Sequence, residues 1–410
     1  MASSKVLIIG CGVAGPVVAM LLKQKGYNPI IFERVETQED IGASLMIAPN
    51  GLKVLDLVGD VSRRLLDNGP NVEWMLEHKA DGEALGASDI PGRGVHLYKK
   101  PAVGIKRTLV ASWLRDMAKE NGIELRQGWS LEGIDETDHE VTAHFNGGRS
   151  ETGAFFIGCD GLRATSRKLL LARRGISDGL PRFTGIVQIN GIGPTPASFR
   201  GKPALRNWYG VGMNIVCYPI THQHTSWGMS LAEDTGKEAS WGLYDSETRQ
   251  AILSRLVERL RSEGWDNDVV ELVGGAQRLI KYGLFDRPPI EAEQWYNSRC
   301  VMIGDAVHPM SVHVGQGANQ ACEDAYYLSQ QLPAYDPAGL STARLTDAFS
   351  TYAHQQQPHV EMVAKSARQQ GAIRVVPAER REERDELVRR TMADKQGLQA
   401  KYDAVFTKPF

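Results

Sequence analysis

The 410-residue chain lacks any run of about 18 consecutive apolar residues, so no segment is long enough to span a membrane as a helix. Its first residues, MASSK, lack the apolar core of a signal peptide. Only five cysteines are present, and they are widely spaced without a C-x-x-C pair. This spacing excludes a disulfide framework and a zinc site and indicates reduced thiols. We therefore expect a cytoplasmic protein that binds no metal.

The chain also lacks an excess of either charge. Lysine and arginine number 47 against 49 acidic residues, for a formal net charge of −2. No large basic field is present to attract nucleic acid. A basic group of Arg380, Arg381 and Arg384 alternates with acidic residues and predicts a solvated helix face. Hydrophobic residues make up 42% of the chain, enough to bury the cores of two domains.

A dinucleotide-binding pattern is present near the N-terminus. The stretch GCGVAG, residues 10–15, follows the apolar run VLII, which is typical of a strand buried on both faces. An apolar helix pattern comes next and ends near Gly26. The segment NPIIFER then predicts a second strand that ends at Glu33. Strand, glycine-rich turn, helix, strand and acid in this order predict a βαβ nucleotide site.

Each part of this pattern has a physical role. Gly10 permits a tight turn, Gly12 lets the backbone approach a pyrophosphate, and Gly15 lets the helix pack closely on the strand. The helix N-terminus offers unpaired N–H groups and a partial positive charge to the phosphates. Glu33 lies where a carboxylate accepts hydrogen bonds from a ribose, which disfavours NADP at this site. The motif alone does not distinguish NAD from FAD.

Two more acidic residues follow apolar strands further along the chain. In FFIGCDGLRATSR, residues 155–167, a strand leads to Asp160. In RCVMIGDAVHPMSVHVGQGANQ, residues 299–320, a strand leads to Gly304-Asp305, and Gly315 and Gly317 then open a helix. A carboxylate at Asp305 could accept hydrogen bonds from a polyol chain. The backbone N–H groups at the helix start could hold a phosphate or an anionic ring.

The three motifs in this order resemble the class A flavoprotein monooxygenases, the group of p-hydroxybenzoate hydroxylase and salicylate hydroxylase. The resemblance covers roughly residues 5–360. It implies an α/β fold, in which a Rossmann-like FAD-binding domain carries an inserted β-rich substrate domain and a helical C-terminus. It also implies FAD as cofactor, NADPH or NADH as a transient reductant, and O2 as a substrate. Such enzymes hydroxylate aromatic or other electron-rich small molecules through a flavin C4a-hydroperoxide.

The resemblance also implies roles for individual residues. Arg107 corresponds to an arginine that contacts FAD, Asp160 to an aspartate near the pyrophosphate, and Asp305 to the ligand of the ribityl chain. Val312 and Ser44 depart from the family pattern, which usually has proline and often glycine at these two positions. The implied FAD site comprises Gly10, Gly12, Ala14, Gly15, Glu33, Arg34, Gly42, Ala43, Ser44, Arg107, Asp160, Gly304, Asp305, Gly315, Gly317, Ala318 and Asn319.

The expected domains are discontinuous. We expect the FAD-binding domain to comprise residues 1–70, 101–175 and 285–365, and the β-rich substrate domain to comprise 71–100 and 176–284, followed by a helical region at 366–410. Residues 71–85 predict a hairpin, and residues 246–263 predict an amphipathic helix. Only one full Gly-x-Gly-x-x-Gly occurs, which indicates that NAD(P)H visits the site without a dinucleotide domain of its own.

The catalytic residue is not evident from the sequence. The substrate-side candidates are Arg206, Tyr209 and Tyr218, which lie in the expected substrate domain. We expect His308 and His313 to lie beside the flavin or to pack the loop. An FAD-dependent epoxidase, reductase or dehydrogenase of an alkaloid or terpenoid would share every motif. Halogenation is disfavoured because the W-x-W-x-I-P motif is absent. A non-catalytic FAD-binding protein is the least favoured alternative. Substrate, choice of NADPH or NADH, and oligomeric state stay open.

Overall fold

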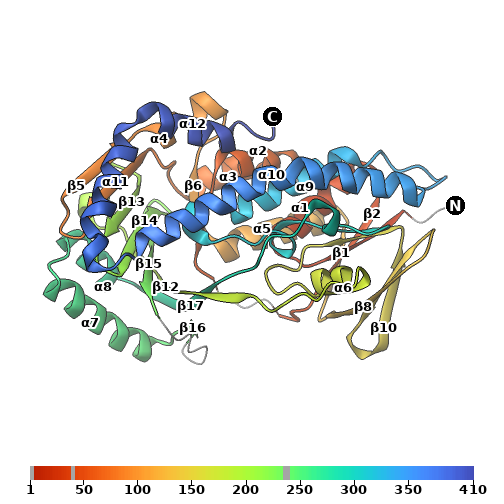
Figure 1. Ribbon diagram of the computed structural model, residues 1–410, viewed down its shortest axis with the longest axis horizontal. Helices are drawn as coiled ribbons and strands as arrows, with labels where there is room; N and C mark the ends of the chain where they lie inside the picture. Colours follow the sequence, from red (N-terminus) through yellow and green to blue (C-terminus); the bar gives the residue numbers. More distant parts are fainter. Residues whose placement is uncertain (1–3, 38–41, 234–240) are drawn as a thin grey trace.

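A computed structural model describes residues 4–37, 42–233 and 241–410 (Figure 1). A five-stranded sheet, in the order β18-β11-β1-β2-β7, forms the base of the nucleotide-binding half. All of its neighbouring strands are parallel. Its central strand is almost fully buried, as expected for an apolar run covered on both faces. The strands are β1 (Lys5–Ile9), β2 (Asn28–Glu33), β7 (Glu124–Gln127), β11 (Phe155–Gly158) and β18 (Cys300–Met302).

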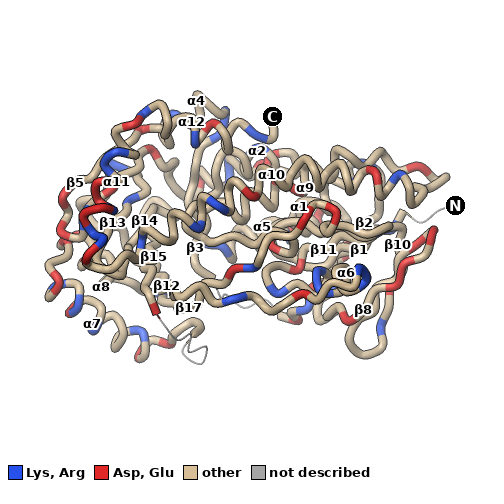
Figure 2. The backbone as a smooth tube through the Cα atoms, viewed as in Figure 1, with Lys and Arg blue, Asp and Glu red and all other residues tan. Residues whose placement is uncertain are grey.

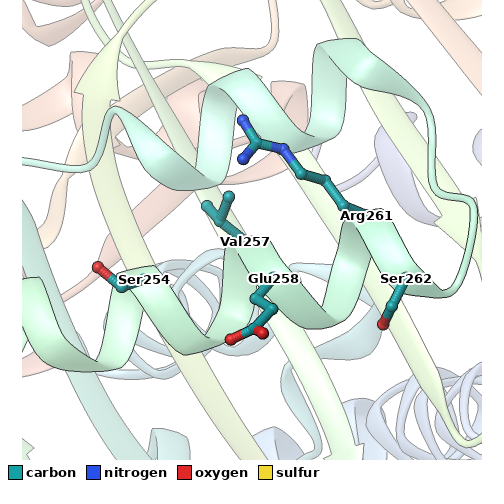
Figure 3. A pocket seen from close by; sticks show the side chains of 5 residues that line it. All are labelled: Ser254, Val257, Glu258, Arg261 and Ser262. Carbon is teal, nitrogen blue, oxygen red and sulfur yellow. The ribbon is translucent and has the colours of Figure 1, made fainter.

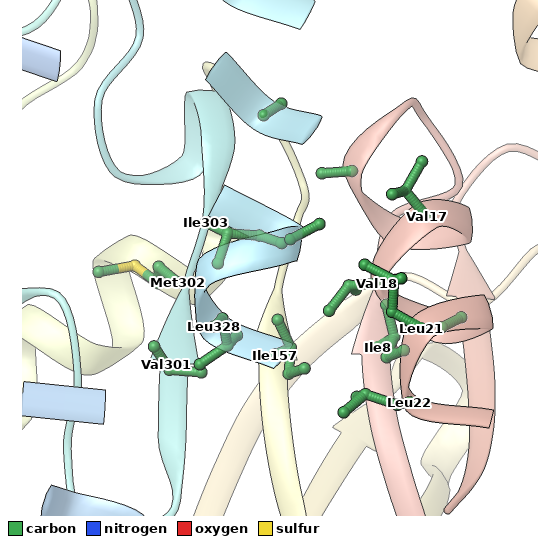
Figure 4. Close-up of a cluster of buried hydrophobic side chains, with 14 of the residues drawn as sticks. Ile8, Val17, Val18, Leu21, Leu22, Ile157, Val301, Met302, Ile303 and Leu328 are labelled. Carbon is green, nitrogen blue, oxygen red and sulfur yellow. The ribbon is translucent and has the colours of Figure 1, made fainter. Parts of the chain in front are cut away.

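Helices cover this parallel sheet. Figure 4 shows Val18 and Leu21 of α1 facing Ile8 and Ile157 of the sheet, with Leu328 of α9 beside them. Burial of these apolar side chains is the main force that joins the helices to the strands. The helices of this half are α1 (Ala14–Gln24), α2 (Pro49–Val58), α3 (Val61–Asn68), α5 (Arg107–Glu120), α6 (Thr165–Arg173), α9 (Gly317–Gln331) and α10 (Thr342–Arg374).

Two small antiparallel sheets complete this half. One pairs two short strands that flank the α2–α4 region in sequence, β3 (Ser44–Ile47) and β6 (Val103–Lys106). The other has three strands, β8 (Leu131–Glu136), β9 (Val141–Phe145) and β10 (Arg149–Gly153).

The second half is built on an eight-stranded sheet in the order β16-β17-β12-β15-β14-β13-β4-β5. Its strands come from two separate parts of the chain, the first two from one and the remaining six from the other, so it is inserted into the nucleotide-binding half. A helix, α4 (Ile90–Tyr98), follows its first two strands. The strands are β4 (Trp74–Lys79), β5 (Ala84–Ser88), β12 (Arg182–Pro194), β13 (Ala204–Tyr209), β14 (Met213–Pro219), β15 (His224–Ala232), β16 (Gly242–Leu243) and β17 (Arg278–Asp286).

The two faces of the large sheet have different neighbours. Helices α7 (Ser246–Ser262) and α8 (Asn267–Gly274) cover one face, where Trp208, Cys217 and Trp227 are buried in a second hydrophobic cluster (Figure 1). On the other face, Tyr218 reaches β3 of the nucleotide-binding half. Side chains point alternately to the two faces along a strand. Whether a residue number is even or odd within a strand therefore decides which of these neighbours its side chain contacts.

The structure confirms the expected α/β architecture with its inserted β-rich part. The hairpin is confirmed as β4–β5, and the amphipathic helix as α7. The expected boundary between residues 365 and 366 falls inside α10, one continuous helix of 33 residues. Two further helices, α11 (Arg381–Ala393) and α12 (Lys395–Phe406), follow it.

The basic group at the start of α11 only partly follows the sequence expectation. Figure 2 shows blue and red residues mixed along this helix. Arg380 is solvated and pairs with Glu383. Arg384, however, is 2% exposed, pairs with Asp385, and donates to the Gly210 carbonyl oxygen at 3.0 Å. The prediction of a solvated face is therefore wrong for Arg384, whose charge is balanced inside the protein and ties α11 to the end of β13.

Candidate active site

The glycine-rich turn lies at the carboxyl end of β1. Gly10 has φ of 105°, and a Cβ there would lie 2.4 Å from the Cys159 carbonyl oxygen. A Cβ at Gly15 would lie 2.0 Å from the Gly10 carbonyl oxygen. The protein itself therefore requires these two glycines. A Cβ at Gly12 would meet no protein atom within 4 Å, so the chain leaves open space at this position of the turn.

Glu33 closes the next strand and faces the same turn. Its Oε2 accepts a hydrogen bond from the Cys11 backbone N–H at 2.8 Å, and its Oε1 accepts one from Val35 N–H at 2.9 Å. Both bonds fix the carboxylate beside the first turn of α1, with lone pairs left over for ribose hydroxyls. Ala14 begins α1 and is buried, and Arg34 is exposed after β2. These groups fit the ADP part of a dinucleotide.

Two aspartates follow the neighbouring strands at the same edge of the sheet. Asp160 accepts from the Ser166 N–H at 2.9 Å and from the Ser166 hydroxyl, so it holds the start of α6. Burial raises the pKa of its carboxyl. Asp305 follows β18 and is exposed, yet enough protein surrounds it that desolvation raises the pKa of its carboxyl. Ligands of open parallel sheets bind at this carboxyl edge.

A third group approaches from the β3–β6 pair. Arg107 opens α5, and its backbone N–H donates to the Ala43 carbonyl oxygen at 3.0 Å, while Gly42 lies against its side chain. The exposed Arg107 guanidinium interacts electrostatically with Asp305. The structure therefore brings Arg107, residues 42–44 and Asp305 together, although more than 60 residues separate each from the next in sequence.

The loop after β18 is held by a buried network. Asp324 on α9 accepts from the Gly304 N–H at 2.7 Å and from Gln356 Nε2 at 3.1 Å, and it pairs with His308 Nε2. Burial alone would lower the pKa of His308, but the Asp324 carboxylate outweighs it and raises that pKa. This network fixes the short turn η5 (Gly304–Ala306) that presents Asp305.

Asn319 anchors the start of α9. Its amide accepts from the Ala48 N–H at 3.0 Å and donates to the carbonyl oxygens of Met46 at 3.1 Å and Gly315 at 2.8 Å. Gly315 ends the turn η6 (Val312–Val314) with φ of 63°, and Gly317 and Ala318 form the first turn of α9. Asn319 therefore sets where the helix N-terminus points, as an anion-binding helix start requires.

The large sheet meets this site through hydroxyl groups. Ser44 Oγ lies 2.7 Å from Tyr218 Oη and 2.7 Å from Ser226 Oγ. Tyr282, on the same face, donates to Gln188 Oε1 at 2.8 Å. Burial raises the pKa of Tyr218 to about 12, so its phenol stays protonated at neutral pH. Of the three substrate-side candidates, only Tyr218 lies in direct contact with the β3 strand.

The other two substrate-side candidates lie elsewhere. Arg206 faces the α7–α8 side, where its guanidinium lies 4.1 Å from the centre of the Phe199 ring and donates to the Lys202 carbonyl oxygen at 2.9 Å. The structure does not bring it to the site. Tyr209 lies on the correct face but deeper, among Met75, Leu85 and the C-terminal helices.

Several functional candidates were missed in the sequence. Asp324 interrupts the apolar stripe of α9, and an acid inside such a stripe is a signal of a buried partner. Glu77 and Arg374 lie near Tyr209, and burial raises the pKa of Glu77 to about 7. His313, which the sequence did single out as a flavin-side or loop-packing residue, is buried, and desolvation lowers its pKa to about 3, so its ring is neutral. No pattern in the sequence links Glu77 to Arg374.

A surface hollow elsewhere is unrelated to this arrangement. It is lined by α7 alone (Figure 3) and contains none of the residues above; its lining residues are Ser254, Val257, Glu258, Arg261 and Ser262. Among the described helices, none is long and apolar enough to cross a membrane.

Comparison with known proteins identifies the class. A family model described as "FAD binding domain" matches residues 3–367, and the chain therefore belongs to this family. It is 28% identical over 374 residues to the 3-amino-4-hydroxybenzoate 2-monooxygenase PtnB3 of Streptomyces platensis, covering 90% of this chain and 87% of that protein. It is 26% identical over 335 residues to the 6-hydroxynicotinate 3-monooxygenase of Pseudomonas fluorescens, covering 80% and 83%.

Solved structures agree in fold. The crystal structure of Klebsiella pneumoniae HpxO with FAD and uric acid has a TM-score of 0.83 at 20% identity, covering 99% of this chain and 97% of that one. A salicylate hydroxylase substrate complex has a TM-score of 0.77 at 19% identity, covering 99% and 98%. The chain is an FAD-dependent monooxygenase of the class A type, hence an oxidoreductase, with NAD(P)H as the typical reductant of such enzymes.

Proposed function

We propose that this monooxygenase hydroxylates an aromatic or other electron-rich small molecule, which binds between the carboxyl edge of the parallel sheet and the large sheet. The observation that carries the proposal is the contact of Ser44 with Tyr218 and Ser226. It joins the strand expected beside the flavin to the sheet expected to hold the substrate. The names of the relatives, which hydroxylate a hydroxybenzoate and a hydroxynicotinate, support a ring as the target.

The residues present fit FAD. Gly12 leaves room for the pyrophosphate, Glu33 offers a fixed carboxylate to the ribose, and Asp305 with the N-terminus of α9 offers polar groups to the remainder of the cofactor. Arg107, beside Asp305, supplies a positive charge at the same place. When bound, FAD supplies the redox chemistry by which NAD(P)H and O2 yield an oxygen atom for transfer.

The chain's own contribution is to orient the substrate and to exclude water. We propose that the neutral Tyr218 phenol hydrogen-bonds a hydroxyl or carbonyl group of the substrate, held in place by Ser44 and Ser226. Because burial raises its pKa, Tyr218 keeps the proton on its Oη at neutral pH. His308 and Asp324 hold the loop that presents Asp305.

The test is reconstitution of the purified protein with FAD, followed by NADPH and NADH oxidation with a panel of phenols, indoles and hydroxylated heteroaromatics. We expect substrate-stimulated oxidation, with one atom of ¹⁸O2 incorporated per product molecule. Incorporation of ¹⁸O from labelled water instead, or oxidation that no compound accelerates and that yields only H2O2, would count against the proposal.

A further inference from the structure

The site-facing side of the large sheet carries a band of uncharged polar side chains. Cross-strand pairing places Gln188 opposite Tyr282 on one side and Ser230 on the other. Ser230 in turn pairs with Asn214, and Asn214 with Tyr209. Side chains directly opposite each other in an antiparallel sheet lie on the same face. The five residues therefore form one polar row across β17, β12, β15, β14 and β13.

The neighbouring residues on this face of the central strands are also uncharged. On this face, alternate positions of 188–192, 205–209, 214–218 and 226–230 hold no Lys, Arg, His, Asp or Glu. Gly228 lies in the middle, where a Cβ would come within 2.9 Å of Asn190 Oδ1 and 3.3 Å of Gln188 Nε2. Its lack of a side chain lets both amides lie over the sheet.

The band includes side chains that are fully buried. Asn214 and Ser230 are fully buried, and Asn214 Oδ1 and Ser230 Oγ have no hydrogen-bond partner within the part of the chain that the structure describes. Buried polar atoms nearly always have a hydrogen-bond partner, and where the protein supplies none, an ordered water or a ligand group can take that place. The deep end of this face is therefore suited to hydrogen bonding and not to ion pairing.

The arginines nearest this face lie at its margins or on the opposite face. Arg206 is on the opposite face, and Arg278, at the margin, donates to the Gly42 carbonyl oxygen at 3.3 Å. Arg107 interacts electrostatically with Asp305 and also with Tyr282, at the other end of the polar row. Arg374 interacts electrostatically with Tyr209, at one end of the polar row, and with Glu77; its Nη2 donates to the His313 carbonyl oxygen at 3.0 Å, while its Nε has no hydrogen-bond partner within the described residues. Within the described residues, the central strands thus offer no cation to a carboxylate.

We propose that the substrate is an uncharged aromatic compound that bears both hydrogen-bond donors and acceptors, and not an aromatic carboxylate. This inference rests on the proposed function. A carboxylate loses its hydration on binding and regains that energy only from a facing cation or several N–H donors. Amide and hydroxyl groups can instead pair with the alternating donors and acceptors of Gln188, Asn190 and Tyr218.

The test uses matched pairs of probes on the FAD-reconstituted enzyme at pH 8, above the pKa of Glu77. The pairs are 3-hydroxybenzamide with 3-hydroxybenzoate, 6-hydroxynicotinamide with 6-hydroxynicotinate, and indole-3-carboxamide with indole-3-carboxylate. Calorimetry gives each Kd independently of turnover. We expect the amide to bind at least tenfold more tightly than the carboxylate in each pair that binds. Tighter binding of a carboxylate, or no binding by any pair, overturns the inference.

A variant that introduces a positive charge tests whether this face of the sheet sets the preference for the amide. Gln188→Arg places a cation in the band, and we expect the amide-to-carboxylate preference to fall at least tenfold. Gln223→Arg, on an exposed turn outside the band, is the matched control and should leave the preference unchanged. An unchanged preference in folded Gln188→Arg overturns the assignment to this face. If Gln188→Arg does not fold, the amide and carboxylate affinities of the wild type decide whether the inference holds. Failure of FAD uptake or of NAD(P)H oxidation would instead refute the proposed function.

Discussion

Replacing Gly12 by alanine separates the demands of the cofactor from those of the fold. A Cβ at this position meets no protein atom within 4 Å, so the apoprotein should keep its stability to within about 0.5 kcal/mol. The same Cβ projects into the open space where we propose that the pyrophosphate binds. Loss of one charge-assisted hydrogen bond costs about 1.5–3 kcal/mol, which corresponds to FAD binding that is weaker by roughly 10- to 150-fold.

Gly10→Ala is the matched control, with the opposite expectation. Its Cβ would lie 2.4 Å from the Cys159 carbonyl oxygen, at φ of 105°. Backbone strain and overpacking together should cost about 2–5 kcal/mol in the apoprotein. Urea unfolding of the apoproteins and titration with FAD, followed by flavin fluorescence, measure both effects. Wild-type FAD affinity in Gly12→Ala, or destabilisation of its apoprotein comparable to that of Gly10→Ala, would refute the reasoning.

Three further predictions concern single side chains. Asn319→Ala removes three buried hydrogen bonds and should destabilise the apoprotein by roughly 3 kcal/mol in urea unfolding, with weaker FAD binding as well. Glu77 has a folded pKa of about 7 against its ordinary 4.5, so its stabilising contribution is present below pH 4.5 and lost as the pH rises to 7. Relative to Glu77→Gln, the wild type should therefore lose roughly 3 kcal/mol over that window in urea unfolding, and equal pH profiles would contradict this. Tyr218→Phe should keep FAD affinity but lower kcat/KM by about tenfold and divert NAD(P)H oxidation to H2O2. Tyr326→Phe, further along α9 and against Phe410, should change neither.

The proximity of the residues proposed to bind the cofactor could be predicted because it follows from local chain positions. Gly10, Glu33, Asp160 and Asp305 each come at or just after the end of a buried strand, and the carboxyl ends of parallel strands meet at one edge. The spacing within each motif was therefore enough to place them together. The buried pair of His308 and Asp324 was not predicted as a pair, since 16 residues of loop and helix separate them.

The substrate half could not be predicted in the same way. Ser44 and Tyr218 are 174 residues apart and meet only because the inserted sheet packs over the β3–β6 pair. Arg206 was assigned to the substrate side because residues 204–209 were not recognised as a strand. Without a strand assignment, the sequence does not say to which face of the sheet this side chain points. Once β13 is defined, residue parity directs Arg206 toward Cys217 and away from the site.

The most direct test of the central claim is the visible absorption spectrum of the purified chain after FAD addition and gel filtration, recorded anaerobically before and after NADPH or NADH. The structure predicts one FAD retained per chain, loss of its visible absorption when the reductant is added with a bound substrate, and recovery when O2 is admitted. A chain that retains no flavin, or whose bound flavin neither nicotinamide reduces, would contradict the assignment of Gly10, Glu33 and Asp305 to a working flavin site.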